Sequence, residues 1–203
     1  APGTVSLSNV VSGDQVQTGS VTVNTTGNLS SGGKLKAGSY TGIQSVGSTL
    51  TGDDAGNYTF GGLTGNYSVS QLTLTGTAIA ASSSTYGSTV SPGAVSFTNV
   101  VSGDEVTASA SLVGTSLSTG GQIKAGSYQQ RVSAIGGADA GNYSLSSSYT
   151  TPTATYTVDP LALIGTLSAG SSVYGATLAP GTVSLSNVVS GDQVQTGSVT
   201  VNT

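Results

Sequence analysis

The sequence predicts an all-β protein built from tandem, immunoglobulin-like antiparallel β-sandwich domains of about 89 residues per repeat. Short runs alternate between apolar and Ser/Thr residues, as in strands with one solvated face. Turn signals that contain glycine separate these runs roughly every ten residues, which is the spacing of a sandwich. Long motifs recur at offsets of 90 and 88 residues, the size of a domain rather than of a solenoid coil.

The composition excludes several classes of function. The 203 residues include 31 glycines, four basic and eight acidic side chains, and no His, Cys, Met or Trp. The common general base, the thiol nucleophile and the usual zinc ligands are therefore missing. A net charge of −4 argues against nucleic acid, because phosphate binding needs a basic surface. No apolar run has the roughly 20 residues of a membrane span. We expect no enzyme activity, no cofactor, no nucleic acid and no membrane insertion.

The motif Asn-Val-Val-Ser-Gly-Asp marks the repeat most clearly. It occurs at residues 9–14, 99–104 and 187–192. The match is closest between the first and third copies, because residues 2–25 and 180–203 are identical. This identity is expected if the sequence is a window of a longer array in which two types of domain alternate.

Domain boundaries are predicted where the last strand of one repeat runs into the first strand of the next. Residues 1–71 then form a β-repeat that lacks its first strand, residues 72–160 a complete repeat, and residues 161–203 the N-terminal part of a third. The junctions contain no Gly/Ser linker, so we expect them to be stiff.

Alternating apolar residues place the strands within each repeat. The predicted strands include residues 5–7, 21–23, 58–60, 67–69, 72–74, 95–97, 143–145, 156–158 and 161–163. The spacing from Tyr40 to Tyr58 is longer than the equivalent spacing from Tyr128 to Tyr143. We expect this difference to lie in a loop, where changes of length are tolerated.

The motif Asp-Ala-Gly-Asn-Tyr precedes a predicted strand at residues 54–58 and 139–143. It is similar to the tyrosine corner of immunoglobulin-like sandwiches, in which a Tyr hydroxyl bonds to the backbone upstream. Tyr58 and Tyr143 are the candidates for this role. The alternative is a half-buried strand tyrosine, which any β fold can contain.

The Ser-Gly-Asp turns contain three recurring carboxylates, Asp14, Asp104 and Asp192. Asp in such a turn commonly bonds local backbone N–H groups, and we expect that role here. Calcium is the functional alternative, but it needs six to eight oxygen ligands, several of them from carboxylates. We therefore expect no metal.

Two lysines recur in the motif Lys-Ala-Gly-Ser-Tyr, Lys36 and Lys124. One hypothesis is a Lys–Asn isopeptide bond, which needs a buried lysine, an Asn such as Asn9 or Asn57, and a catalytic carboxyl. Each bond would release one ammonia and lower the intact mass accordingly. The alternative is a solvated lysine or a surface ion pair.

Tyr149 has no counterpart in the first repeat and is the best candidate for contact with a ligand. Exposed aromatic side chains commonly pack against sugars, so a glycan would be the class of ligand. The alternative is an ordinary loop tyrosine.

The repeats share an ordered set of motifs, complete in residues 72–160 and partly present in residues 1–71 and 161–203: Leu-Thr-Leu or Leu-Ala-Leu, Tyr-Gly, Ser-Gly-Asp, Ala-Gly-Ser-Tyr and Ala-Gly-Asn-Tyr. This set resembles the mostly-beta glycine-rich (MBG) and YDG-type repeats of filamentous-haemagglutinin-like bacterial adhesins and biofilm matrix proteins. The resemblance covers the whole chain. It departs from the YDG type at Tyr86-Gly87 and Tyr174-Gly175, where that type has Asp between the two residues. The resemblance implies an extracellular stalk or spacer on the bacterial cell surface.

A structural role as such a spacer is the function that we expect. One alternative is a module that binds glycans or a host surface. Another is a filament subunit, in which residues 161–203 of one chain complete the first repeat of the next by strand addition. The expected partners are neighbouring repeats of the same or identical chains, with cell-surface or matrix glycans as the alternative.

Overall fold

The computed structural model describes residues 1–202 and confirms the all-β prediction. Thr203, the last residue of the predicted third repeat, lies outside the described residues. Helical structure in residues 1–202 is limited to two 3-10 turns, η1 (Ala55–Asn57) and η2 (Ala140–Asn142). This part of the chain therefore contains no helix with the length and hydrophobicity to cross a membrane. The described residues form two compact units, and the predicted repeat boundaries stay predictions.

Unit 1 comprises residues 1–77, 97–108 and 134–147. Its strands are β1 (Gln17–Thr18), β2 (Thr22–Val23), β3 (Gly38–Val46), β4 (Leu50–Thr51), β5 (Leu63–Val69), β6 (Leu72–Thr73), β10 (Thr107–Ala108), β13 (Ile135–Gly136) and β14 (Tyr143–Ser144).

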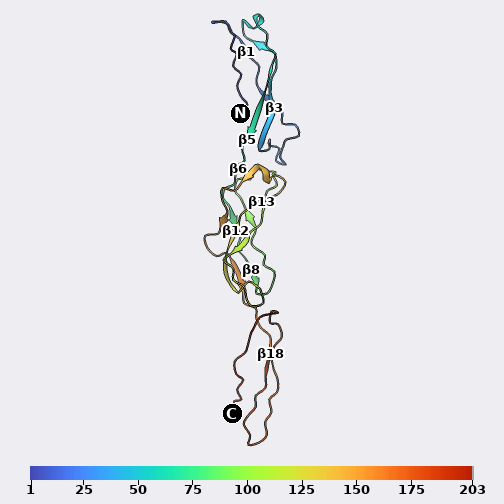
Figure 1. Cartoon of the computed structure of the whole chain (residues 1–203), viewed down its shortest axis with the longest axis vertical. Helices are drawn as coiled ribbons and strands as arrows, with labels where there is room; N and C mark the ends of the chain where they lie inside the picture. The colour runs from blue at the N-terminus through green and yellow to red at the C-terminus, as the bar shows by residue number, and fades with distance from the viewer. Residues whose placement is uncertain (203) are drawn as a thin grey trace. The chain divides into compact units, whose positions relative to one another are not determined.

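The two longest strands of unit 1, β3 and β5, pair antiparallel (Figure 1), and β2 pairs antiparallel with β3 to give a sheet in the order β2-β3-β5. Tyr40 and Tyr67 face each other across this sheet, a cross-strand aromatic pair that stabilises the register. Strand β6 pairs in parallel with β14, so that Leu72 lies opposite Tyr143. The prediction of purely antiparallel pairing is wrong here. About 70 residues separate the two strands, and a long connection of this kind allows a parallel pair.

The difference between the Tyr40–Tyr58 spacing and the Tyr128–Tyr143 spacing lies partly inside a strand. Strand β3 has nine residues, whereas its counterpart β12 (Gly126–Val132) has seven. The register between β3 and β5 shifts between Tyr40 and Gln44, and Gly42 there has φ of 68°. A β-bulge therefore accommodates the extra residues, and the prediction that the whole difference lies in a loop is wrong.

Unit 2 comprises residues 78–96, 109–133 and 148–202. Its strands are β7 (Ala78–Ile79), β8 (Ser82–Thr85), β9 (Val95–Ser96), β11 (Ser111–Val113), β12, β15 (Tyr149–Thr150), β16 (Tyr156–Asp159), β17 (Gly165–Leu167) and β18 (Val183–Leu185).

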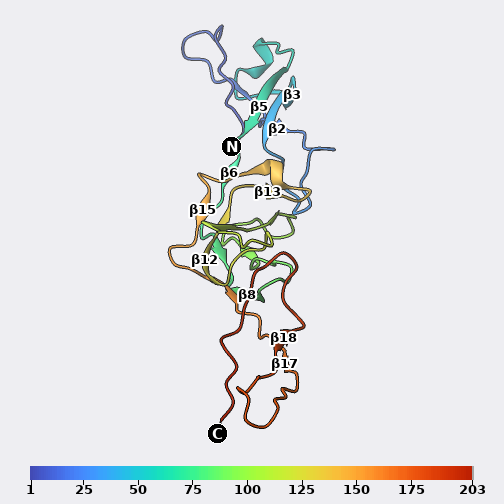
Figure 2. The same ribbon diagram turned by 60° about the horizontal axis from the view of Figure 1, so that its bottom comes forward.

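The main sheet of unit 2 has the order β11-β12-β16-β8, and β15 pairs with the other end of β12. Strands β8 and β16 are parallel, a second exception to the predicted pairing. The buried cluster on this sheet consists of Tyr128, Tyr156 and Val158, with Tyr86 packed against it. A separate antiparallel pair joins β17 to β18 (Figure 2). The aromatic residues that recur in the sequence thus supply the core of unit 2.

Three of the predicted strands do not form. Residues 5–7, 58–60 and 161–163 belong to no ladder, although their apolar and polar residues alternate. Their counterparts in other repeats do pair: β9 with β7, β18 with β17, and β14 with β6. A strand is stable only with a partner, so alternation alone did not suffice at these three places.

Candidate functional site

The Asp-Ala-Gly-Asn-Tyr and Asn-Val-Val-Ser-Gly-Asp motifs contact each other in the same way in two repeats. The hydroxyl of Tyr143 donates to Oδ2 of Asp104 at 2.6 Å and accepts the N–H of Val101 at 3.0 Å. Tyr58 donates to Oδ2 of Asp14 at 2.6 Å and accepts the N–H three residues before that aspartate at 2.9 Å. The two motifs therefore form a recurring contact between segments about 40 residues apart in the sequence.

Two further tyrosines bond to upstream backbone that is closer to them in the sequence. The hydroxyl of Tyr40 donates to the carbonyl of Lys36 at 2.8 Å, and that of Tyr128 to the carbonyl of Lys124 at 2.6 Å. Each bond spans four residues. These two bonds were not predicted, although the repeated motif Lys-Ala-Gly-Ser-Tyr contains both ends of each bond.

The second carboxylate oxygen of two of the motif aspartates accepts a distant glycine N–H. Gly32 donates to Oδ1 of Asp104 at 2.8 Å, and Gly120 donates to Oδ1 of Asp192 at 2.9 Å. Both bonds span 72 residues. The predicted local role of these carboxylates is therefore wrong. The turn is closed by backbone bonds instead, such as that from the N–H of Asp104 to the carbonyl of Val101 at 3.0 Å.

Glycine is required at both donor positions because the two backbones approach closely. A Cβ on Gly32 would lie 2.7 Å from the carbonyl oxygen of Ser102, and one on Gly120 would lie 2.5 Å from that of Ser190. Real Cβ atoms essentially never come so close to a backbone atom. A larger residue would therefore force the segments apart.

In unit 1, further bonds strengthen the contact around Asp104. Asp139 is only 2% exposed, and it accepts the N–H of Glu105 at 2.9 Å and that of Ser31 at 3.2 Å. Asn142 accepts the N–H of Ala37 at 2.9 Å. We call the bonds that Asp104, Asp139 and Asn142 accept from residues 31–37, together with the bond from Tyr143 to Asp104, the junction contact, because they join the predicted first and second repeats.

The first residue of the Asn-Val-Val-Ser-Gly-Asp motif anchors the opening segment of its own repeat. The side chain of Asn99 accepts the N–H of Thr75 at 2.9 Å and donates to the carbonyl of Thr73 at 2.8 Å. Asn187 makes the equivalent pair of bonds to Ile164 and Ala162, at 2.7 and 2.8 Å. Both ends of the motif therefore carry a structural role.

The bonds of the junction contact favour the ionised form of its carboxylates. The Tyr143 hydroxyl lowers the pKa of Asp104, although partial burial opposes this effect. The backbone N–H of Glu105 lowers the pKa of Asp139. Burial, followed by the hydrogen bond to Asp104, raises the pKa of Tyr143. The contact thus pairs an anionic acceptor with a neutral phenol over the neutral pH range.

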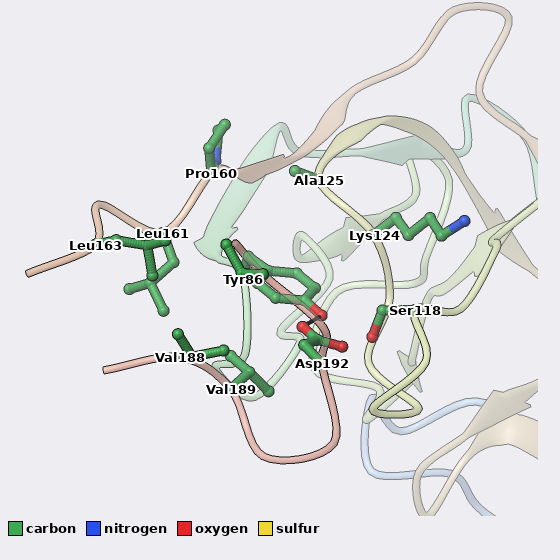
Figure 3. A pocket seen from close by; sticks show the side chains of 11 residues that line it. Tyr86, Ser118, Lys124, Ala125, Pro160, Leu161, Leu163, Val188, Val189 and Asp192 are labelled. Atoms are coloured by element: carbon green, nitrogen blue, oxygen red, sulfur yellow. Dashed lines mark hydrogen bonds between the residues drawn. The ribbon is translucent and has the colours of Figure 1, made fainter. Parts of the chain in front are cut away.

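In unit 2, Asp192 borders a cavity of about 280 Å³ (Figure 3). The Tyr86 hydroxyl points to the Asp192 carboxylate and donates to its Oδ2. This bond lowers the pKa of Asp192. The apolar walls include Leu161, Leu163 and Val189. We call this cavity the Asp192 pocket.

The other sequence candidates lie outside these contacts. Lys36 and Lys124 are exposed, whereas the predicted isopeptide bond requires a buried lysine. Tyr149 lies in β15 opposite Val132 and is half-buried, because it belongs to a strand and not to a loop. Residues 1–202 contain no group of three acidic side chains arranged to hold a metal ion.

The recurring feature of the described residues is therefore a set of hydrogen bonds between segments of successive repeats. No family model matches the chain, and no curated protein or solved structure shows significant similarity to it. The contacts around Asp104 and Asp192 are consequently the basis for a functional proposal.

Proposed function

We propose that this chain is a structural spacer of a secreted bacterial surface adhesin or extracellular fibre, with no catalytic role. The chain would consist of tandem immunoglobulin-like β-sandwich repeats. Its partners would be neighbouring repeats. One observation carries the proposal: the same glycine-to-aspartate bond occurs twice, across 72 residues each time. The resemblance to mostly-beta glycine-rich repeats supports the extracellular setting.

The junction contact gives this proposal a physical mechanism. It uses backbone N–H groups of residues 31–37 and buried or half-buried side chains, so little freedom remains at the joint. A flexible linker would instead leave such groups to water. Each repeat would then add about the length of a ten-residue strand to the spacer, roughly 33 Å.

Electron microscopy of negatively stained particles tests the proposal. The 203-residue chain is compared with a version in which residues 72–160 are duplicated. We expect particle length to increase by a fixed amount, with a narrow distribution of bending angles. The double variant Gly32→Ala/Gly120→Ala should broaden that distribution, and Gly47→Ala/Gly197→Ala should not, because an added Cβ meets nothing within 4 Å at either control position. Equal broadening in both variants would contradict the proposal.

Assembly of several copies into a fibre is a second candidate, and a specific observation favours it. The Asp192 pocket is bordered by residues 161–163, which pair with no strand in this structure. Their counterparts in unit 1, residues 72–74, are paired and bonded.

A further inference from the structure

We infer that strands β8 and β16 form a clamp that resists tension along the chain. The two strands lie near opposite ends of the predicted repeat of residues 72–160, and they pair in parallel within unit 2. The inference goes beyond the proposed function. A spacer sets a distance, whereas a clamp also holds that distance when the two ends are pulled apart.

The parallel direction of the two strands decides how they respond to a pulling force. Tension along the chain reaches β8 at its N-terminal end and β16 at its C-terminal end. Ser82, the first residue of β8, pairs with Tyr156 at one end of the ladder. Asp159, the last residue of β16, pairs with Thr85 at the other end. The force therefore acts along the strands and loads all their hydrogen bonds at once. In an antiparallel pair the two pulled ends would lie together, and the bonds would open one at a time.

Hydrogen bonds join the two strands over the whole length of this ladder. Four residues of each strand are paired. At one end the N–H of Ser82 donates to the carbonyl of Thr155 at 3.1 Å, and at the other the N–H of Tyr86 donates to the carbonyl of Asp159 at 2.8 Å. Because these bonds are loaded together, several must break in the same step before the strands separate.

Buried side chains shield the ladder from water. On β16, Tyr156 is fully buried and Val158 is 3% exposed. The residues opposite them on β8, Ser82 and Ser84, are half-buried. The Tyr156 hydroxyl also accepts the N–H of Ser91 at 3.1 Å, which holds the chain beyond β8 against β16. A hydrogen bond is stronger where the local dielectric constant is low, and water has less access to compete for its donor and acceptor.

A buried glutamine braces the end of the ladder at which tension enters β8. Gln130 lies in β12, which pairs with β16, and its side chain is fully buried. Its Nε2 donates to the carbonyl of Ala80 at 2.8 Å and to Oγ1 of Thr155 at 2.9 Å. Its Oε1 accepts the N–H of Gly93 at 2.6 Å. The residues that lead into β8 and into β16 are thus tied to the same side chain in the middle of the sheet.

The other parallel pair within residues 1–202 has the same relation to the chain. It joins β6 to β14 in unit 1, and the N–H of Leu74 extends it with a bond to the carbonyl of Ser144 at 2.8 Å. Both parallel pairs therefore join an early strand of the predicted repeat to a late one, and the remaining ladders of the described residues are antiparallel. Parallel pairing thus occurs where tension along the chain would shear the strands.

Two pulling geometries on the 203-residue chain test the inference. The chain has no cysteine of its own, so two introduced thiols define where the handles of an optical-tweezers experiment are attached. Ala81→Cys/Ala162→Cys is held before β8 and after β16, and tension shears the clamp. Ser88→Cys/Ala162→Cys is held beyond the same end of the ladder on both strands, and tension unzips it. The three substituted positions are exposed, so each variant is the control for the other.

We expect the sheared clamp to open about tenfold more slowly than the unzipped one at the same constant force. This ratio corresponds to a barrier about 1.4 kcal/mol higher. A difference of this size is expected when at least two hydrogen bonds must break together instead of one. The length of chain released identifies the event in each trace, because it is set by the residues between the two thiols.

A disulfide tests the strand pairing separately. Ser83 and Thr157 are exposed partners in the ladder, and neighbouring strands lie about 4.8 Å apart, a separation that a disulfide can bridge. Ser83→Cys/Thr157→Cys should therefore lose both free thiols on oxidation without forming dimers on non-reducing gels. Ser127, the partner of Thr157 on the other side of β16, lies two strands away from Ser83. Ser83→Cys/Ser127→Cys is thus the matched control and should keep its thiols.

Equal opening rates in the two pulling geometries, with the disulfide between residues 83 and 157 formed, would overturn the inference and leave the proposed function intact. Failure of that disulfide would also overturn the inference, because β8 and β16 would then not be paired.

Discussion

Gly32 donates its backbone N–H to the carboxylate of Asp104 at 2.8 Å, although 72 residues separate them in the chain. Gly103, the residue before Asp104, lies over Gly32 so closely that a Cβ on Gly103 would be 3.0 Å from the Cα of Gly32. A carboxylate and two glycines therefore fix the distance between two segments. The recurrence of this arrangement at Gly120, Gly191 and Asp192 shows that it belongs to the repeat.

Gly32→Ala should destabilise the protein by about 1–3 kcal/mol, the usual cost of an overpacked contact. The added methyl group would meet the Asp104 carboxylate and the Ser102 carbonyl, and backbone must move to admit it. Gly47→Ala is the matched control, since its Cβ meets nothing within 4 Å. Urea unfolding followed by circular dichroism measures both. Equal midpoints for the two variants would contradict the role of the close approach.

Tyr143→Phe should lower the free energy of unfolding by about 1–3 kcal/mol, because it leaves the Asp104 carboxylate and the Val101 N–H without their shared partner. Tyr67→Phe is the control, because Tyr67 is a half-buried strand tyrosine opposite Tyr40 and its hydroxyl is not part of the junction contact. Thermal unfolding at pH 7 compares the two. A loss of stability in Tyr67→Phe as large as in Tyr143→Phe would show that the hydroxyl bond is not the cause.

Asn99→Ala should cost about 1–3 kcal/mol, since two bonds to the backbone of residues 73–75 are lost. The chain offers its own control in Asn9, which occupies the same position of the motif. Asn9 is exposed, and its side chain does not anchor a strand in the way that Asn99 does. Asn9→Ala should therefore leave the unfolding midpoint nearly unchanged. Chemical denaturation of both variants checks this difference.

Stability should fall on acidification below about pH 3.9, the ordinary pKa of Asp. The folded pKa values of Asp104, Asp139 and Asp192 are lowered, so the unfolded chain binds more protons in this range. These carboxylates contribute to the free energy of unfolding at pH values above their pKa in the unfolded chain. This contribution is lost as the pH falls through their pKa values in the folded protein. Melting temperatures from pH 6 to pH 2 measure how steeply stability changes with pH. Asp104→Asn should reduce it, and Asp53→Asn, which is exposed, should not.

The sequence predicted the all-β class because alternation and turn residues are local signals. It failed at residues 58–60 and 161–163, where the pattern is present but the partner strand is not. It also missed the bulge near Gly42, since the extra residues keep a strand-like composition. Strand pairing depends on distant segments, and no local pattern reports it.

The candidate site was only partly visible in the sequence. Tyr143 and Asp104 were both identified, but as separate local features, and the structure joins them at 2.6 Å. The glycine donors were overlooked, although Gly32 and Gly120 recur 88 residues apart, as do Asp104 and Asp192. The matching offsets of the two pairs were the available signal. A glycine that faces a distant backbone cannot be distinguished from a turn glycine by its neighbours alone.

The constant separation of 72 residues between each glycine and its aspartate has a genetic consequence. Each of these aspartates bonds to a glycine of the preceding repeat, and residues 72–160 contain one half of each bond, Asp104 as an acceptor and Gly120 as a donor. Unequal recombination that inserts or deletes one whole period would create a new joint with all its bonding groups in place. An insertion of a fraction of a period would not. We therefore expect alleles of such a gene to differ in length by whole repeats, without loss of the ability to fold.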